Sequence, residues 1–139
     1  MPDVLHEYEI SMERLENLFH SAFVPCTRDP DGDIRIEEEG VRTFLKLDVE
    51  KKLIVMFSIW PMRASVSEGR KLEWINELNR KLVLVKFQMV RPDVLWCDYQ
   101  LRYEGGVSPM QLVGTVRLFS RVCRGAAAQK GGHEIIGKD

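Results

Sequence analysis

Residues 65–89, SVSEGRKLEWINELNRKLVLVKFQM, decide the fold, because within them a helical pattern of apolar residues changes into the alternating pattern of a strand. Ser65 and Glu68 have the spacing of a capping box, which marks a helix start. Apolar residues then recur at helical spacing, at Leu72, Ile75, Leu78 and Leu82. Alternating positions follow at Val83, Val85, Phe87 and Met89. The stretch therefore predicts an amphipathic helix that leads directly into a strand.

Upstream of this stretch, the sequence predicts one helix and three strands. Ser11 precedes an apolar stripe that ends before Pro25, which indicates a capped first helix. The run DPDGD at 29–33 is typical of a turn, and a strand over 34–38 follows it. Apolar residues alternate over 41–49 and again over 53–60, on either side of a polar turn, and predict two further strands.

Downstream, residues 95–103 alternate as a fifth strand and a last helix follows. Ser108 and Pro109 are the residues expected at the cap and the first position of that helix. The predicted order, α-β-β-β-α-β-β-α, is that of an α+β domain with a five-stranded antiparallel sheet and its helices mainly on one face. We predict an N-terminal extension over 1–10, one domain over 11–128 and a flexible C-terminal tail over 129–139.

Composition excludes several classes of protein. The 139 residues suffice for one hydrophobic core, and 20 basic against 21 acidic residues leave a net charge of −1. A chain without excess positive charge is not expected to bind nucleic acid. No apolar run approaches the roughly 18 residues of a membrane span, and the first ten residues do not resemble a signal peptide. We expect a cytoplasmic protein with no membrane contact.

The residues that most often carry chemistry are scattered. Three cysteines lie far apart with no metal-binding spacing, which is typical of reduced, buried thiols. Three histidines are also widely separated, and no phosphate-binding glycine loop or hydrolase motif is present. Asp29, Asp31 and Asp33 have the spacing that starts a calcium loop, but Ile34 and Gly40 replace its required glycine and glutamate, so a solvated turn is favoured. We predict no catalytic residue, no metal and no cofactor.

Asn76 and Asn79 lie on or beside the apolar stripe of the central helix. A buried amide without partners costs about 1 to 3 kcal/mol, so a hydrogen bond to neighbouring backbone is the predicted role.

The second face of the predicted sheet is unusually apolar. It lies opposite a core face assigned to Leu45, Val55, Phe57, Phe87 and Tyr99. The candidate partner-binding residues on it are Phe44, Ile54, Met56, Trp60, Leu84, Trp96 and Arg102. Aromatic residues with arginine are typical of protein interfaces, whereas a face open to water is mainly polar. Three explanations remain open: a protein interface, cover by the chain's own first helix or tail, and a small-molecule groove.

Three short pieces carry a resemblance to a known family: Asp31-Gly32-Asp33, Leu78-Asn79-Arg80, and GVSPMQL at 106–112. With the element order, they resemble the YbjN family, which is described as a family of bacterial sensory transduction regulators and looks like the type III secretion chaperone fold. The resemblance covers roughly residues 11 to 126. It implies a bacterial, cytoplasmic, non-enzymatic domain that is often dimeric and binds other proteins, and it carries over no catalytic residue.

The sequence thus favours a non-enzymatic, chaperone- or adaptor-like protein-binding domain with a regulatory role in bacterial signalling or stress response. A homodimer is expected, with binding through the second sheet face or through an exposed strand edge. The alternative is a small-molecule sensor or an uncharacterised enzyme with a pocket between helices and sheet.

Overall fold

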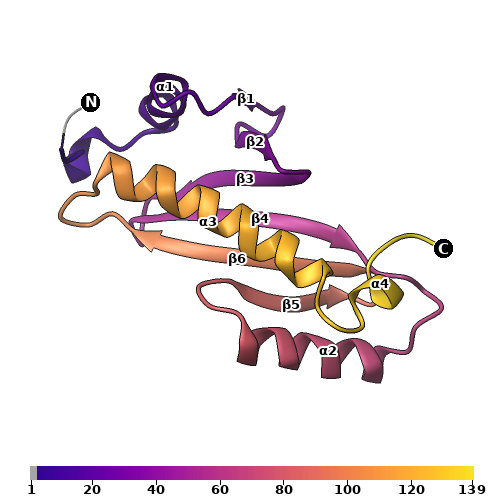
Figure 1. The fold of residues 1–139 in the computed structure, drawn as a ribbon. Coiled ribbons are helices and arrows are strands. Elements are labelled where there is room, and N and C mark those ends of the chain that lie inside the picture. The colour runs from indigo at the N-terminus through magenta and orange to yellow at the C-terminus, as the bar shows by residue number, and fades with distance from the viewer. Residues whose placement is uncertain (1–2) are drawn as a thin grey trace.

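In the computed structural model, which describes residues 3–139, six antiparallel strands form one sheet in the order β1-β2-β3-β4-β6-β5 (Figure 1). The strands are β1 Cys26–Arg28, β2 Ile34–Glu38, β3 Val41–Asp48, β4 Leu53–Pro61, β5 Lys86–Arg91 and β6 Val94–Arg102. The helices are α1 Met12–Ser21, α2 Glu68–Lys81, α3 Pro109–Ala127 and the short α4 Gly132–Ile135, with a 3₁₀ turn, η1, at Glu7–Glu9.

The α+β class predicted from the sequence is confirmed, but the count of five strands is wrong. The additional strand, β1, has three residues and pairs antiparallel with β2, with Thr27 opposite Arg35. A three-residue strand is too short to show an alternating pattern, so the sequence alone does not reveal it. The turn predicted at 29–33 joins β1 to β2, and Asp29 Oδ1 accepts the Asp33 N–H at 2.9 Å.

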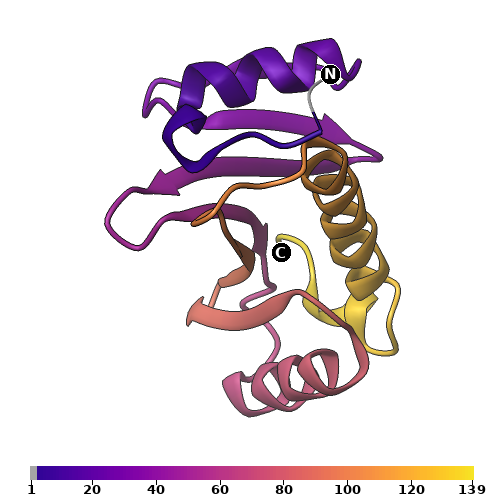
Figure 2. The same cartoon turned by 90° about the vertical axis from the view of Figure 1, so that its left-hand side faces the viewer.

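One hydrophobic core lies between the sheet and the helices. Figures 1 and 2 show α3 crossing one face of the sheet, with α1 beside the β1–β2 end and α2 beside β5. Buried residues of all three helices belong to the same core as that face, for example Phe19 of α1, Leu78 of α2 and Phe119 of α3. We call this the inner face of the sheet and the opposite one the outer face.

Serine caps start the three long helices. Ser11 Oγ accepts the Arg14 N–H at 3.1 Å, and Ser108 Oγ accepts the Gln111 N–H at 3.3 Å, as predicted. For α2 the predicted cap was wrong, because Ser67 accepts from the third residue along, at 3.3 Å. Ser65 instead hydrogen-bonds the carboxylate of Asp139. Two serines two residues apart offer the same local chemistry, and the tertiary contact selects between them.

The buried face of α2 is rotated from the predicted one. Leu72 is 51% exposed, whereas Trp74 and Lys71 are buried beside Ile75 and Leu78. The Lys71 ammonium donates to the Pro92 carbonyl in the β5–β6 turn. This bond ties α2 to the sheet and gives a buried charge a partner.

Strand β4 also faces the opposite way from the prediction. Phe44 pairs with Phe57 and Leu45 with Met56, so Ile54 and Met56 point to the inner face, where both are fully buried. Val55 and Phe57, assigned to the core from the sequence, lie on the outer face. Four consecutive apolar residues, 54–57, hide the alternation, and a shift of one residue moves every side chain to the other face.

The chain's ends differ from the extension and loose tail predicted. Leu5 and Val107 exchange two backbone hydrogen bonds, at 2.8 and 2.9 Å, next to the start of α3. At the other end, Ile135 of α4 is buried and its carbonyl accepts the Arg63 N–H at 2.8 Å. Met62 and Ile136 form an antiparallel bridge. Residues 129–136 therefore form part of the packed structure.

Candidate functional site

The outer face of the sheet carries no α-helix in the part of the chain that the structure describes (Figure 2). The strand registers place the following residues on it: Arg42, Phe44 and Lys46 of β3; Val55, Phe57 and Ile59 of β4; Trp96, Asp98 and Arg102 of β6; and Lys86 of β5. The neighbouring strands β3, β4 and β6 therefore each place an aromatic side chain on the outer face, and basic side chains of β3, β5 and β6 lie around them.

A row of three stacked aromatic rings crosses this face. The Phe44 and Phe57 centroids are 5.3 Å apart, and those of Phe57 and Trp96 are 4.7 Å apart. The Lys46 ammonium lies 5.3 Å from the Phe57 centroid. The neighbouring rings and this cation leave Phe57 only 7% exposed without a covering helix, whereas Ile59 at the end of the row is 50% exposed. Stacked pairs contribute roughly 0.5 to 1.5 kcal/mol beyond their burial, so stacking helps to hold the three rings against one another.

Hydrogen bonds and ion pairs hold the polar residues around the row. The Trp96 indole N–H donates to Asp98 Oδ2 at 3.0 Å, and the Lys86 ammonium is 3.9 Å from Asp98 Oδ1. Arg102 pairs with Glu104 at 2.8 Å. This face therefore combines a fixed aromatic centre with a charged rim, the composition expected of a protein contact surface.

The structure brings together only part of the predicted partner-binding set. Phe44, Trp96 and Arg102 lie on the outer face as predicted. The assignment of Ile54, Met56 and Trp60 to the same face is wrong. Ile54 and Met56 are core, and Trp60 packs against that core from the inner side.

Leu84 is not in the sheet at all. It lies in the α2–β5 connection, 42% exposed and with a φ of 70°, because β5 begins only at Lys86. The prediction missed Phe57 and Ile59. The cross-strand register places both residues beside Phe44 and Trp96. It cannot be predicted from the sequence of a strand in which consecutive residues are all apolar.

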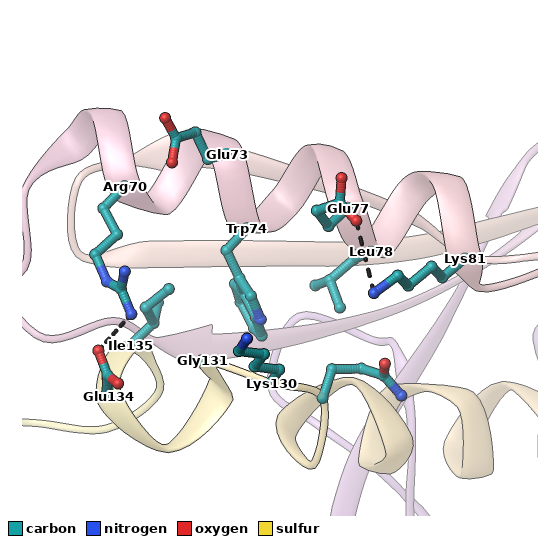
Figure 3. Close-up of a pocket in the computed structure, with 11 residues that line it drawn as sticks. Arg70, Glu73, Trp74, Glu77, Leu78, Lys81, Lys130, Gly131, Glu134 and Ile135 are labelled. Carbon is teal, nitrogen blue, oxygen red and sulfur yellow. Dashed lines mark hydrogen bonds and ion pairs between the residues drawn. The ribbon is translucent and has the colours of Figure 1, made fainter.

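Apart from the outer face, a cleft with a volume of about 410 Å³ lies between α2 and the α3–α4 turn (Figure 3). Trp74 and Leu78 project into it from α2, and Ile135 lines it from α4. An ion pair between Arg70 and Glu134 closes one end, and Lys81 contacts Glu77 at 3.6 Å on the other side. We call this feature the α2–α4 cleft.

The cysteines are not arranged for nucleophilic chemistry. Cys97 and Cys123 are buried, and burial together with a hydrogen bond to Cys123 raises the pKa of Cys97 well above its ordinary value. Burial also raises the pKa of Cys26. A reactive cysteine needs a lowered pKa, and the pKa values of Cys26 and Cys97 are shifted in the opposite direction.

Residues 3–139 contain no group of three or more metal-ligating side chains placed to hold an ion. Within the same residues, no helix is both long and apolar enough to cross a membrane.

The fold and the two surfaces describe an α+β domain whose single antiparallel sheet is covered by helices on one face and open on the other. The family model described as "Putative bacterial sensory transduction regulator", YbjN, matches residues 11–129. The chain belongs to the YbjN family, and the resemblance seen in the sequence is confirmed. No curated protein sequence matches the chain.

Two solved structures share the fold. The crystal structure of YbjN from E. coli, titled "a putative transcription regulator", superposes with a TM-score of 0.76 at 14% identity, covering 92% of this chain and 96% of that one. A chain in the structure of the HopA1–SchA chaperone–effector complex superposes with a TM-score of 0.58 at 11% identity, covering 80% of this chain and 88% of that one. The likeness to a chaperone fold is therefore confirmed at the level of architecture.

Proposed function

We propose that this protein binds another protein through the outer face of its sheet and has no catalytic activity. The row formed by Phe44, Phe57 and Trp96, with exposed Ile59 at its end, carries the proposal. An antiparallel sheet face left to water is normally polar, and this one is apolar at its centre. The fold it shares with a chain from a chaperone–effector complex supports a protein partner.

The sheet's face is a better candidate than its edges, because side chains already occupy both edge strands. The Asn79 amide hydrogen-bonds the backbone of Phe87 on β5 with two bonds of 2.9 Å. At the other edge, the His20 ring lies 3.2 Å from the Cys26 carbonyl of β1, which is only three residues long. An added strand would have to displace these contacts.

The remaining features of the proposal rest on the family and on the composition of the sequence. We infer a cytoplasmic, bacterial protein with a regulatory role in signalling or stress response, which binds neither nucleic acid nor a membrane. A second copy of the chain is one candidate partner for the outer face, which would make the protein a homodimer.

Two variants with matched exposure test the proposal. Ile59→Asp places a charge on the outer face, and Leu72→Asp places one on α2, at residues that are 50% and 51% exposed. Both variants should fold, as judged by circular dichroism. We expect wild type and Leu72→Asp to retain the same partner, or the same dimer, in affinity capture and light scattering, and Ile59→Asp to lose it. Equal retention by Ile59→Asp would refute binding through the outer face.

A further inference from the structure

We propose that the outer face binds an acidic segment of another protein, with apolar residues on both sides of the acidic one, and that Phe23 in the α1–β1 turn is one of its anchor points. This inference rests on the proposed function and adds the chemistry of the partner. Three features carry it: two grooves that meet on the outer face, the conformation and exposure of Phe23, and the charges between the grooves.

The two grooves meet at Glu37 of β2, which lines both. The first, of about 650 Å³, is lined by Phe44 and Ile59, and it lies where β3 and β4 part, because the pairing of these strands begins only at Phe44. The second, of about 520 Å³, is lined by Pro25 and by Thr27 of β1. The grooves therefore cross the sheet from β4 to β1. Three strand spacings amount to about 15 Å, which about five extended or about ten helical residues span.

Phe23 lies in the turn between His20 and Pro25, which both line the second groove. The Val24 N–H donates to the Phe19 carbonyl at 2.8 Å and the Phe23 N–H donates to the His20 carbonyl at 3.1 Å. These are the hydrogen bonds of a Schellman motif, in which Phe23 holds the left-handed position with a φ of 60°. Glycine is usual there, because a side chain in this conformation costs free energy.

The local structure does not explain a phenylalanine at this position. Phe23 is 90% exposed, so burial of its ring within residues 3–139 does not offset the conformational cost. Strained residues persist at functional sites, and aromatic side chains are frequent among the residues that dominate the energy of protein interfaces. The binding surface therefore extends from the outer face to the α1–β1 turn.

Between the grooves, two guanidinium groups share one carboxylate. Arg42 Nε lies 3.2 Å from Glu37 Oε1, and Arg35 pairs with the same oxygen. The three side chains are between 38% and 58% exposed, and neither arginine forms another ion pair within the described residues. One positive charge is left uncompensated there, and an acidic residue is its complement. In a face-to-face dimer the same patch would meet its own positive charge, so another protein fits better than a second copy.

A phage-displayed library of random 12-residue peptides, selected on the 139-residue protein, reports which sequences the surface accepts. We expect the enriched peptides to carry an acidic residue with apolar residues on both sides. Enrichment of basic or purely polar peptides, or no enrichment, would overturn the proposal.

Phe23→Gly separates binding from folding, because glycine takes the left-handed conformation without a side-chain cost. The variant should unfold at no lower denaturant concentration than wild type. It should nevertheless bind an enriched, fluorescently labelled peptide at least about fivefold more weakly in fluorescence anisotropy, the effect of losing an interface anchor. Met110→Ala, at an 80% exposed residue of α3, should leave the affinity within about twofold. Wild-type affinity in Phe23→Gly would overturn the role of Phe23.

Charge and the proposed function are tested with the same peptide. Arg42→Gln should weaken its binding about threefold, and raising the salt from about 50 mM to about 500 mM should weaken wild-type binding as well. Affinity that changes with neither would overturn the acidic partner. Ile59→Asp should lose both the peptide and the cellular partner. If Ile59→Asp loses the partner while Phe23→Gly and Arg42→Gln retain it as wild type does, the outer face remains the binding surface and this inference fails.

Discussion

Asn79 of α2 and Phe87 of β5 exchange two hydrogen bonds, as paired residues of neighbouring antiparallel strands do. The Asn79 Nδ2 donates to the Phe87 carbonyl and the Phe87 N–H donates to Asn79 Oδ1, both at 2.9 Å. The side-chain amide thus takes the place of a strand at the free edge of β5, as predicted for Asn79. The same role was predicted for Asn76, which is exposed instead. An unpaired strand edge is a template for aggregation, and this contact blocks it.

Replacing Asn79 by alanine should lower the free energy of unfolding by about 1 to 3 kcal/mol, because two backbone groups of β5 lose their partners. Chemical denaturation measures this directly, and light scattering should show increased self-association. Asn76→Ala is the matched control, since Asn76 is an exposed asparagine on the same helix. If both variants unfold at the same denaturant concentration, the amide contact contributes nothing.

Met56→Asp should prevent folding. Met56 is fully buried on the inner face, opposite Leu45, and an unpaired carboxylate there has neither water nor a cation. We expect a destabilisation of at least about 3 kcal/mol, a large share of the stability of a typical domain. Circular dichroism and solubility provide the measurement. A folded Met56→Asp protein of wild-type stability would mean that the β4 register is wrong.

Stability should fall at alkaline pH because of Cys97. Its folded-state pKa is raised by burial, so the unfolded chain releases the thiol proton at about pH 8.5 while the folded chain keeps it. The contribution is present below that pH and decreases by up to about 1.4 kcal/mol per pH unit above it. Unfolding free energies between pH 7 and 10 should decline less steeply in Cys97→Ala than in wild type. Parallel curves would contradict the assignment.

Glu7 should make the attachment of the N-terminal segment sensitive to acid. Hydrogen bonds from the Lys52 ammonium and the Gly105 N–H lower the pKa of Glu7, so its contribution is present at neutral pH and lost as pH falls through that lowered pKa. In Glu7→Gln, the Leu5 and Val107 amides should exchange hydrogen faster than in wild type at pH 7. This difference should shrink as the pH falls below about 4.3, the ordinary pKa of a glutamate, and disappear once the pH is below the lowered pKa of Glu7.

Glu50→Gln is the control for Glu7→Gln, because Glu50 is exposed in the β3–β4 turn and forms no ion pair within residues 3–139. Equal exchange rates in wild type and Glu7→Gln at pH 7 would show that the two backbone bonds hold the segment without Glu7.

The sequence by itself determined the elements whose signals are local. Ser11 and Ser108 cap their helices where predicted. These caps could be predicted because a capping hydrogen bond joins residues only three positions apart in the sequence. The α+β class and the family resemblance also rest on local patterns, although the predicted order lacked the strand β1 and the short helix α4.

The tertiary structure alone decided which face of β4 is core and which residues form the two surfaces. Residues 54–57 are all apolar, so only pairing with β3 selects between their faces, and it placed Met56 inside and Phe57 outside. The α2–α4 cleft joins residues 70–81 to residues 129–135, and β1 exists only because β2 pairs with it. Such contacts between distant parts of the chain depend on three-dimensional packing, which no local pattern of residues encodes.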